Sequence, residues 1–229
     1  MIMTILIRDI LQDLERTREN MLALSDDIWL SIDHNDEESM REGVAFKTEY
    51  NDRMKSFDRL AKEISELVQQ YTQVRMDEVE PEIAAESESE RNARVVRELN
   101  REEAHGLNED FTFKRPFGFI LDGHATSGVT TWQRLYELVC RHLLDRDEGR
   151  FRALHDHPDF ISSRGHHNVT SDPNSLRKAM KLADGLFVES NLSANSIRDV
   201  IARLLNAYEI PTESMKVFLR EDRDAEESN

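Results

Sequence analysis

Residues 117–143 read FGFILDGHATSGVTTWQRLYELVCRHL, and the hydrophobic period of this stretch changes halfway along it. Apolar residues occupy every second position from Phe117 to Leu121, as expected for a strand whose side chains alternate between two faces. The Asp-Gly pair at 122–123 is typical of a tight turn, so we expect residues 124–129 to return as a second strand. After Thr130, which we expect to cap a helix, the apolar spacing becomes three and four. The stretch therefore predicts a strand hairpin followed by a helix.

The remainder of the C-terminal half continues this mixture of elements. After an irregular loop we expect a strand, a helix and a closing strand, namely residues 186–188, a helix capped by Ser193 or Asn195, and residues 215–219. The order of strands and helices is that of a small α+β domain with two main helices, which we assign to residues 111–220.

The N-terminal segment, residues 1–75, predicts an antiparallel helical hairpin. Apolar residues recur at alternating spacings of three and four in two runs separated by a polar turn, where Asn35 and Glu38 form a capping-box pattern. The expected contact residues are Ile7, Ile10, Leu14, Thr17, Met21, Leu24 and Ile28 in the first helix, and Met40, Val44, Lys47, Tyr50, Met54, Phe57, Ala61, Ile64, Val68 and Tyr71 in the second. This pattern is that of a coiled coil. Because two helices alone have little core, we expect residues 1–75 to form a homo-oligomer or to bind a partner protein.

Residues 76–110 and 221–229 are strongly acidic. The first segment begins with Pro81 among glutamates and serines, which predicts a flexible linker, and Ser87 with Glu90 predicts a capped short helix at about 88–104 that docks only lightly. The last nine residues predict a disordered acidic tail.

Charge is distributed unevenly along the chain. The formal net charge is −16, and it divides into −6 for residues 1–75, −8 for 76–110, +2 for 111–220 and −4 for 221–229. The chain holds 23 arginines and 7 lysines, and this acidic, lysine-poor composition resembles that of proteins from salt-accumulating archaea. Overall, such a charge favours solubility and repels nucleic acid, so the slightly basic C-terminal half stands out.

No stretch approaches the roughly 18 to 20 apolar residues that a membrane-spanning helix needs, and Arg8 and Asp9 interrupt the apolar N-terminus. We therefore expect a soluble, cytoplasmic protein without a membrane partner. The single cysteine, Cys140, lies in an apolar helical run, which predicts a small buried side chain.

Residues 117–123, 129–140 and above all 172–208 together resemble a domain found at the C-terminus of many uncharacterised bacterial and archaeal proteins. The likeness covers about residues 111–220 and is densest around Gly185 to Asn195. This resemblance implies a domain boundary near residue 111. That domain is loosely associated with genomic neighbourhoods of mobile elements and DNA restriction, so the resemblance also implies a role connected with DNA. It implies no activity or catalytic residue.

Five of the eight histidines lie between His142 and His167, and His155–His167 is the candidate metal site. A zinc site needs three or four ligands at short spacing on regular elements, and this stretch offers no such frame. Glycine-rich phosphate loops and a GxSxG nucleophile motif are also missing from the sequence. We therefore expect no catalytic residue, no metal and no cofactor, and a metal-dependent enzyme using this loop is a remote alternative.

Two function classes remain. In the first, the protein is a non-enzymatic DNA-associated regulatory or accessory protein, oligomerised by its hairpin, whose basic residues contact phosphates. The candidate nucleic-acid-binding residues are Arg146, Arg150, Arg152, Arg164, Arg177, Lys178 and Lys181. In the second class, the protein is an adaptor or scaffold without nucleic-acid contact, and the hairpin is the surface that binds other proteins.

Overall fold

The computed structural model describes residues 2–74, 87–162 and 165–221, and the chain divides into two units, Met1–Ala85 and Glu86–Asn229. The first unit is helical and the second contains helices and two small antiparallel sheets, which makes the protein α+β as predicted. The beginning of the predicted linker around Pro81 and the tail after residue 221 lie outside the described residues.

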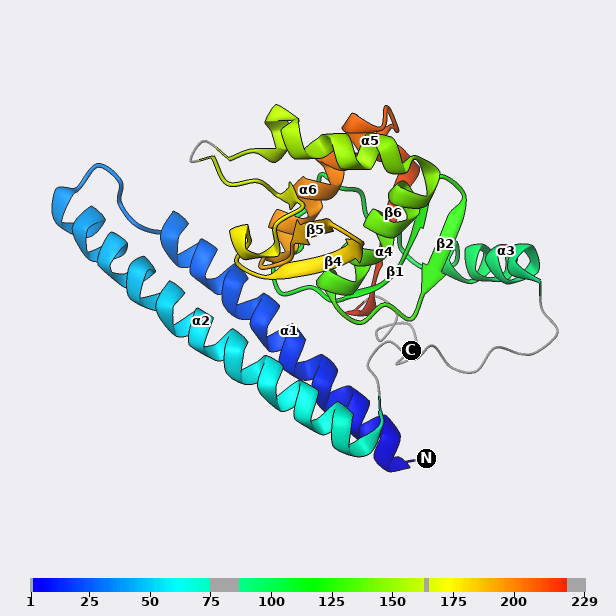
Figure 1. Cartoon of the computed structure of the whole chain (residues 1–229), viewed down its shortest axis with the longest axis horizontal. Helices are drawn as coiled ribbons and strands as arrows, with labels where there is room; N and C mark the ends of the chain where they lie inside the picture. Colours follow the sequence, from blue (N-terminus) through cyan, green and yellow to red (C-terminus); the bar gives the residue numbers. More distant parts are fainter. Residues whose placement is uncertain (1, 75–86, 163–164, 222–229) are drawn as a thin grey trace. The chain divides into compact units, whose positions relative to one another are not determined.

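The first unit consists of α1 (Ile2–Leu30) and α2 (Glu37–Thr72), which lie side by side in blue and cyan in Figure 1. The two helices run antiparallel, because Ser25 Oγ accepts a hydrogen bond from Lys47 Nζ at 2.7 Å and the Met21 carbonyl accepts one from Tyr50 Oη at 2.8 Å. The helix cap is Asp36, whose carboxylate accepts from the Ser39 amide at 2.8 Å. The predicted capping pair is therefore displaced by one residue.

The column of α1 that faces α2 also differs from the prediction. Arg18 and Ser25 are buried, whereas Ile10 and Leu24 are 57% and 43% exposed. Alternating spacings of three and four fit both columns, so spacing alone could not choose between them. Polar contacts decide, because Ser25 binds Lys47 and Arg18 interacts electrostatically with Asp58 of α2.

The second unit contains two three-stranded antiparallel sheets, with strand orders β2-β1-β6 and β3-β5-β4. The strands are β1 (Pro116–Leu121), β2 (His124–Ser127), β3 (Val169–Thr170), β4 (Ala179–Ala183), β5 (Leu186–Glu189) and β6 (Met215–Leu219). The sequence predicted β1, β2, β5 and β6 but neither β3 nor β4. Both additional strands pair with β5, so they depend on a partner strand as much as on their own residues.

Three helices follow the first hairpin, namely α4 (Trp132–Arg146), the short α5 (Glu148–Ala153) and α6 (Ala194–Ala207). Thr131 rather than Thr130 caps α4, and Ser193 caps α6. The apolar faces of α4 and α6 belong to one continuous core with both sheets, and Cys140 is buried in it as predicted. These helices are the green and orange ribbons of the compact unit in Figure 1.

Helix α3 (Glu88–Leu99) begins with the predicted capping box of Ser87 and Glu90, but it docks firmly. Leu99 is fully buried, and it packs with Val95 in a second cluster that includes Ile120 and Phe218 of the first sheet. Asn92 adds polar contacts, because its amide donates to the Gly123 carbonyl and accepts from the Ala125 amide, each at 2.8 Å. The second unit thus begins near residue 86 rather than at 111.

Among the described residues, no helix is both long and apolar enough to cross a membrane.

Candidate functional site

Most of the basic side chains predicted to contact nucleic acid are neutralised by acids of the same unit. Arg150 binds Glu209 at 2.6 Å, Arg152 binds Glu148 at 2.7 Å, and Lys181 binds Asp184 at 2.7 Å. Arg146 forms an ion pair with Asp122 in the β1–β2 turn. Such pairs lower the positive potential that a phosphate backbone would meet, because each cation already has a counter-charge beside it.

The structure brings only part of this set together. Arg152 donates to the Asp184 carbonyl at 3.3 Å, so Arg152 and Lys181 meet at the β4–β5 turn. Arg146 and Arg150 instead contact the β1–β2 turn and the segment after α6. These arginines therefore point to three different parts of the unit rather than to one continuous basic stripe.

The remaining predicted residues behave differently from one another. Lys178 donates to the Gln133 side chain at 2.8 Å, and the side chain of Arg177 is exposed. The backbone amides of both residues donate to the Glu189 carboxylate at 3.1 Å or less, which fixes the start of β4 against the end of β5. Arg164 lies outside the described residues.

The histidine-rich stretch is held by its own backbone. His155 Nδ1 donates to the Val169 carbonyl at 3.0 Å, His167 Nδ1 donates to the His155 carbonyl at 2.7 Å, and the two rings stack with centroids 4.4 Å apart. Across residues 2–74, 87–162 and 165–221, no three histidine, cysteine or acidic side chains gather as metal ligands would. The observed contacts assign these two imidazoles a role in closing the loop.

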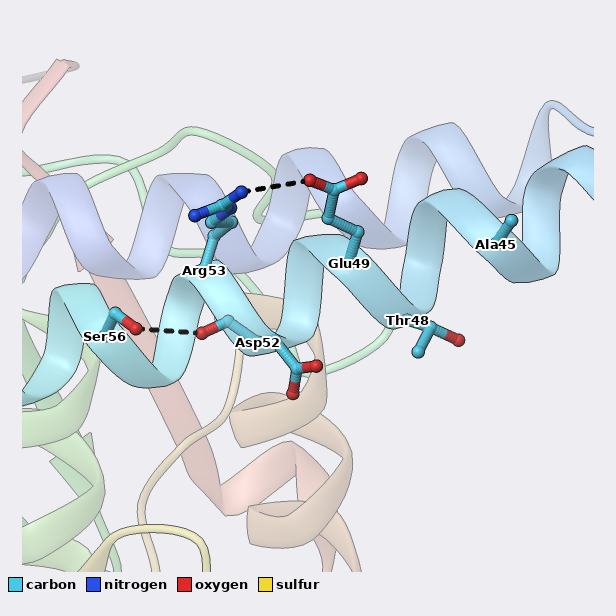
Figure 2. A pocket seen from close by; sticks show the side chains of 6 residues that line it. All are labelled: Ala45, Thr48, Glu49, Asp52, Arg53 and Ser56. Carbon is cyan, nitrogen blue, oxygen red and sulfur yellow. Dashed lines mark hydrogen bonds and ion pairs between the residues drawn. The ribbon is translucent and has the colours of Figure 1, made fainter.

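A shallow polar depression lies on the outer side of α2, and its lining comes from that helix alone, namely Ala45, Thr48, Glu49, Asp52, Arg53 and Ser56. Figure 2 shows Glu49 and Arg53, joined by a 3.2 Å ion pair, leaving the helix on one side while Thr48 and Asp52 leave on the other. Because these side chains diverge, the depression does not converge on a reacting group, and it offers no constellation for catalysis.

A polar network that the sequence did not indicate joins the segment before β1 to the start of α6. Asn195 donates to Asp110 at 2.8 Å and accepts from the Phe111 amide at 2.9 Å, and Arg198 donates to the Glu109 carbonyl at 2.6 Å. The partners lie about 85 residues apart in the chain, so no local pattern could reveal them. The network positions Phe111, whose ring packs 4.7 Å from that of Trp132.

Replacement of Asp110 by asparagine is expected to lower the Tm only above about pH 4. Hydrogen bonds from Asn195 and then from Thr112 lower the pKa of Asp110 from 3.8 to about 2. The carboxylate therefore stabilises the folded state above its unfolded pKa, and this contribution is lost as the pH falls through 2. Since the Asp110 carboxylate is exposed, we expect the variant to lose roughly 0.5–1 kcal/mol of free energy of unfolding, which corresponds to a fall in Tm of about 2–4 °C. Calorimetry of the wild type and the variant at pH 6 and pH 2 measures the difference in Tm. An equal difference at both pH values would contradict the prediction.

The hairpin carries a surface of another kind. Large apolar side chains of α1 and α2 remain exposed, and we call those on one side of the hairpin the apolar face: Met3, Leu6, Ile10, Leu24, Phe46, Leu60, Ile64, Leu67 and Tyr71. Ile5, Leu30 and Val44 are also exposed, but at other helical positions. The spacing predicted Ile10, Leu24, Val44, Ile64 and Tyr71 as contacts between the two helices, but all five are exposed, and it did not indicate Leu60 and Leu67. The missed signal was that each helix holds more apolar columns than a two-helix contact can bury.

Comparison of the chain with protein-family models, curated proteins and solved structures found no match.

Proposed function

We propose that the protein is a non-enzymatic interaction protein, an adaptor or scaffold whose α1–α2 hairpin is the surface that binds protein. The observation that carries this proposal is the apolar face, where large side chains such as Leu67, 66% exposed, lie on a regular helix surface. Large apolar side chains that are exposed together on one side of a helix pair are typical of protein interaction sites. The second unit supports the proposal, because four of the basic side chains predicted to contact nucleic acid form ion pairs, namely Arg146, Arg150, Arg152 and Lys181.

A DNA-associated role is the second candidate, favoured by the net charge of +2 over residues 111–220 and by the exposed Arg177. It requires the ion pairs of Arg146, Arg150 and Arg152 to open, and each opening gives up an interaction that a phosphate must then replace. We therefore rank this role below the adaptor role.

The two roles predict different results for DNA binding. At about 150 mM salt, the full chain should bind a labelled 20-base-pair duplex with a Kd above about 10⁻⁴ M, which is weaker than the usual range for non-specific binders. Fluorescence anisotropy provides the measurement. Micromolar binding that falls steeply with salt, and that weakens when Arg146, Arg150 and Arg152 are replaced by alanine, would establish the DNA role instead. A variant with Lys55 replaced by alanine is the control, since that lysine belongs to the hairpin.

A further inference from the structure

We infer that the partner of the apolar face is the apolar face of a second copy of this chain, so that two hairpins form a four-helix bundle with their open ends together. The open end is the end at which α1 begins and α2 finishes. This inference rests on the proposed function, because it concerns the same face, and it names the occupant.

The contact between α1 and α2 leaves much apolar surface outside. Two inward positions of α1 are the polar residues Arg18 and Ser25, and α2 contributes Lys47 to the same interface. In the described part of the first unit the buried apolar residues are only Leu11, Ala23, Met54 and Val74. A pair of helices with so few buried apolar side chains gains little from the hydrophobic effect by itself.

The residues of the apolar face form one column on each helix, and both columns lie on the same side of the hairpin. On α1, Ile10 and Leu24 each precede an inward residue, Leu11 or Ser25, by one position. On α2, Leu60 likewise precedes the inward-facing Ala61. One residue rotates a helix position by about 100°. Since the helices run in opposite directions, equal rotations about their own axes bring both columns to the same side.

Toward the open end, the charges of α2 lie away from this side, whereas its other end carries Glu42, Glu49 and Arg53 on the same side as Phe46. Lys55, Arg59, Lys62 and Glu66 are exposed at positions rotated by more than about 100° from the stripe of Leu60, Ile64, Leu67 and Tyr71. The net charge of −6 in residues 1–75 therefore does not oppose contact between two apolar faces at short range, because charges separated by about a Debye length of 10 Å are screened.

The dimensions fit a dimer interface. Helix α1 has 29 residues, which corresponds to a length of about 43 Å at 1.5 Å per residue. Two adjacent helices, each about 10 Å across, then present roughly 800–900 Å² to a partner. A stable interface needs about 800 Å² from each side, so one hairpin face is large enough for a second copy.

The distribution of apolar residues sets the orientation of the two hairpins. Leu60, Ile64, Leu67 and Tyr71 follow one another at spacings of four, three and four toward the open end. A dimer with open ends together places these stripes against each other. The opposite orientation would set the stripe against the end that carries Glu42, Glu49 and Arg53, and would bury those charges against apolar side chains at a cost. With open ends together, these residues instead face their own counterparts, which include both signs of charge.

The test is the mass of the full-length protein in solution. The wild type should have twice the mass of one chain by light scattering coupled to chromatography. The double variant Ile64→Asp and Leu67→Asp should be monomeric at the same concentration, with association weakened at least about a hundredfold. The matched control adds two carboxylates on the other side of α2, Thr48→Asp and Gln70→Asp, and should remain dimeric, because both positions are exposed. A monomeric wild type, or a double variant that remains dimeric, would overturn the inference.

A second measurement does not depend on how the double variant folds. Cys140 is fully buried and burial raises the pKa of its thiol, so it does not react with a cross-linker under conditions where an exposed cysteine does. A single Leu67→Cys replacement should give a covalent dimer with a short bis-maleimide, and Thr48→Cys should give none. Equal cross-linking at both sites would contradict the orientation. A monomeric wild type would contradict the dimer inference but not the proposed adaptor role. Salt-dependent DNA binding would contradict the adaptor role.

Discussion

Replacement of Met54 by aspartate is expected to unfold the α1–α2 hairpin while the second unit remains folded. Met54 is 3% exposed and belongs to the contact between the two helices, so the variant would bury a carboxylate among apolar side chains. Such burial costs on the order of 3–5 kcal/mol, which exceeds what a two-helix contact with a polar interior can supply. Because α1 and α2 are the two longest helices that the structure describes, with 29 and 36 residues, the far-ultraviolet circular dichroism signal should fall strongly when they unfold.

Hydrogen exchange resolves the expected loss by segment. Amides of α1 and α2 should lose protection, and amides of α4 and α6 should keep it, since the two units have separate cores. Ser56→Asp provides the control, because this exposed position on the same helix accommodates a carboxylate in water. Retention of full helicity by the Met54 variant would show that the assignment of this side chain to the helix contact is wrong.

Replacement of Leu99 by alanine should destabilise the second unit by about 2–5 kcal/mol, as for other fully buried leucines. Leu99 is 0% exposed and packs over Gly118. A Cβ atom added at Gly118 would lie only 3.1 Å from Cδ2 of Leu99. The cavity left by the truncated side chain cannot fill easily, since the sheet beneath it is fixed by its ladder of hydrogen bonds. Chemical denaturation followed by near-ultraviolet circular dichroism measures the change.

The neighbouring exposed residue provides the comparison for this prediction. Arg97→Ala should change the free energy of unfolding by no more than about 0.5 kcal/mol. If Leu99→Ala also had so small an effect, α3 would be a lightly attached helix, as the sequence suggested, and the second unit would begin further along the chain.

Local patterns in the sequence determined much of this architecture. The change from a period of two to spacings of three and four after Phe117 predicted β1, β2 and α4, and the structure contains all three. The caps at Ser87 and Ser193 were also predictable, because a cap depends on residues within one helical turn. The same reasoning identified the two long helices of the hairpin and placed the cap of α2 within one residue.

Tertiary structure decided the features whose energies come from residues distant in the chain. Spacing allowed either Ile10 or Leu11 to face α2, and contacts such as that of Lys47 with Ser25 selected the column that contains Leu11. Docking of α3 depends on a sheet that forms from residues 20 to 120 positions later. Ion pairs such as that of Arg150 with Glu209 place an acid beside a side chain that the sequence predicted to contact nucleic acid. Each outcome rests on side chains that meet only after folding, which is why composition and periodicity could not supply it.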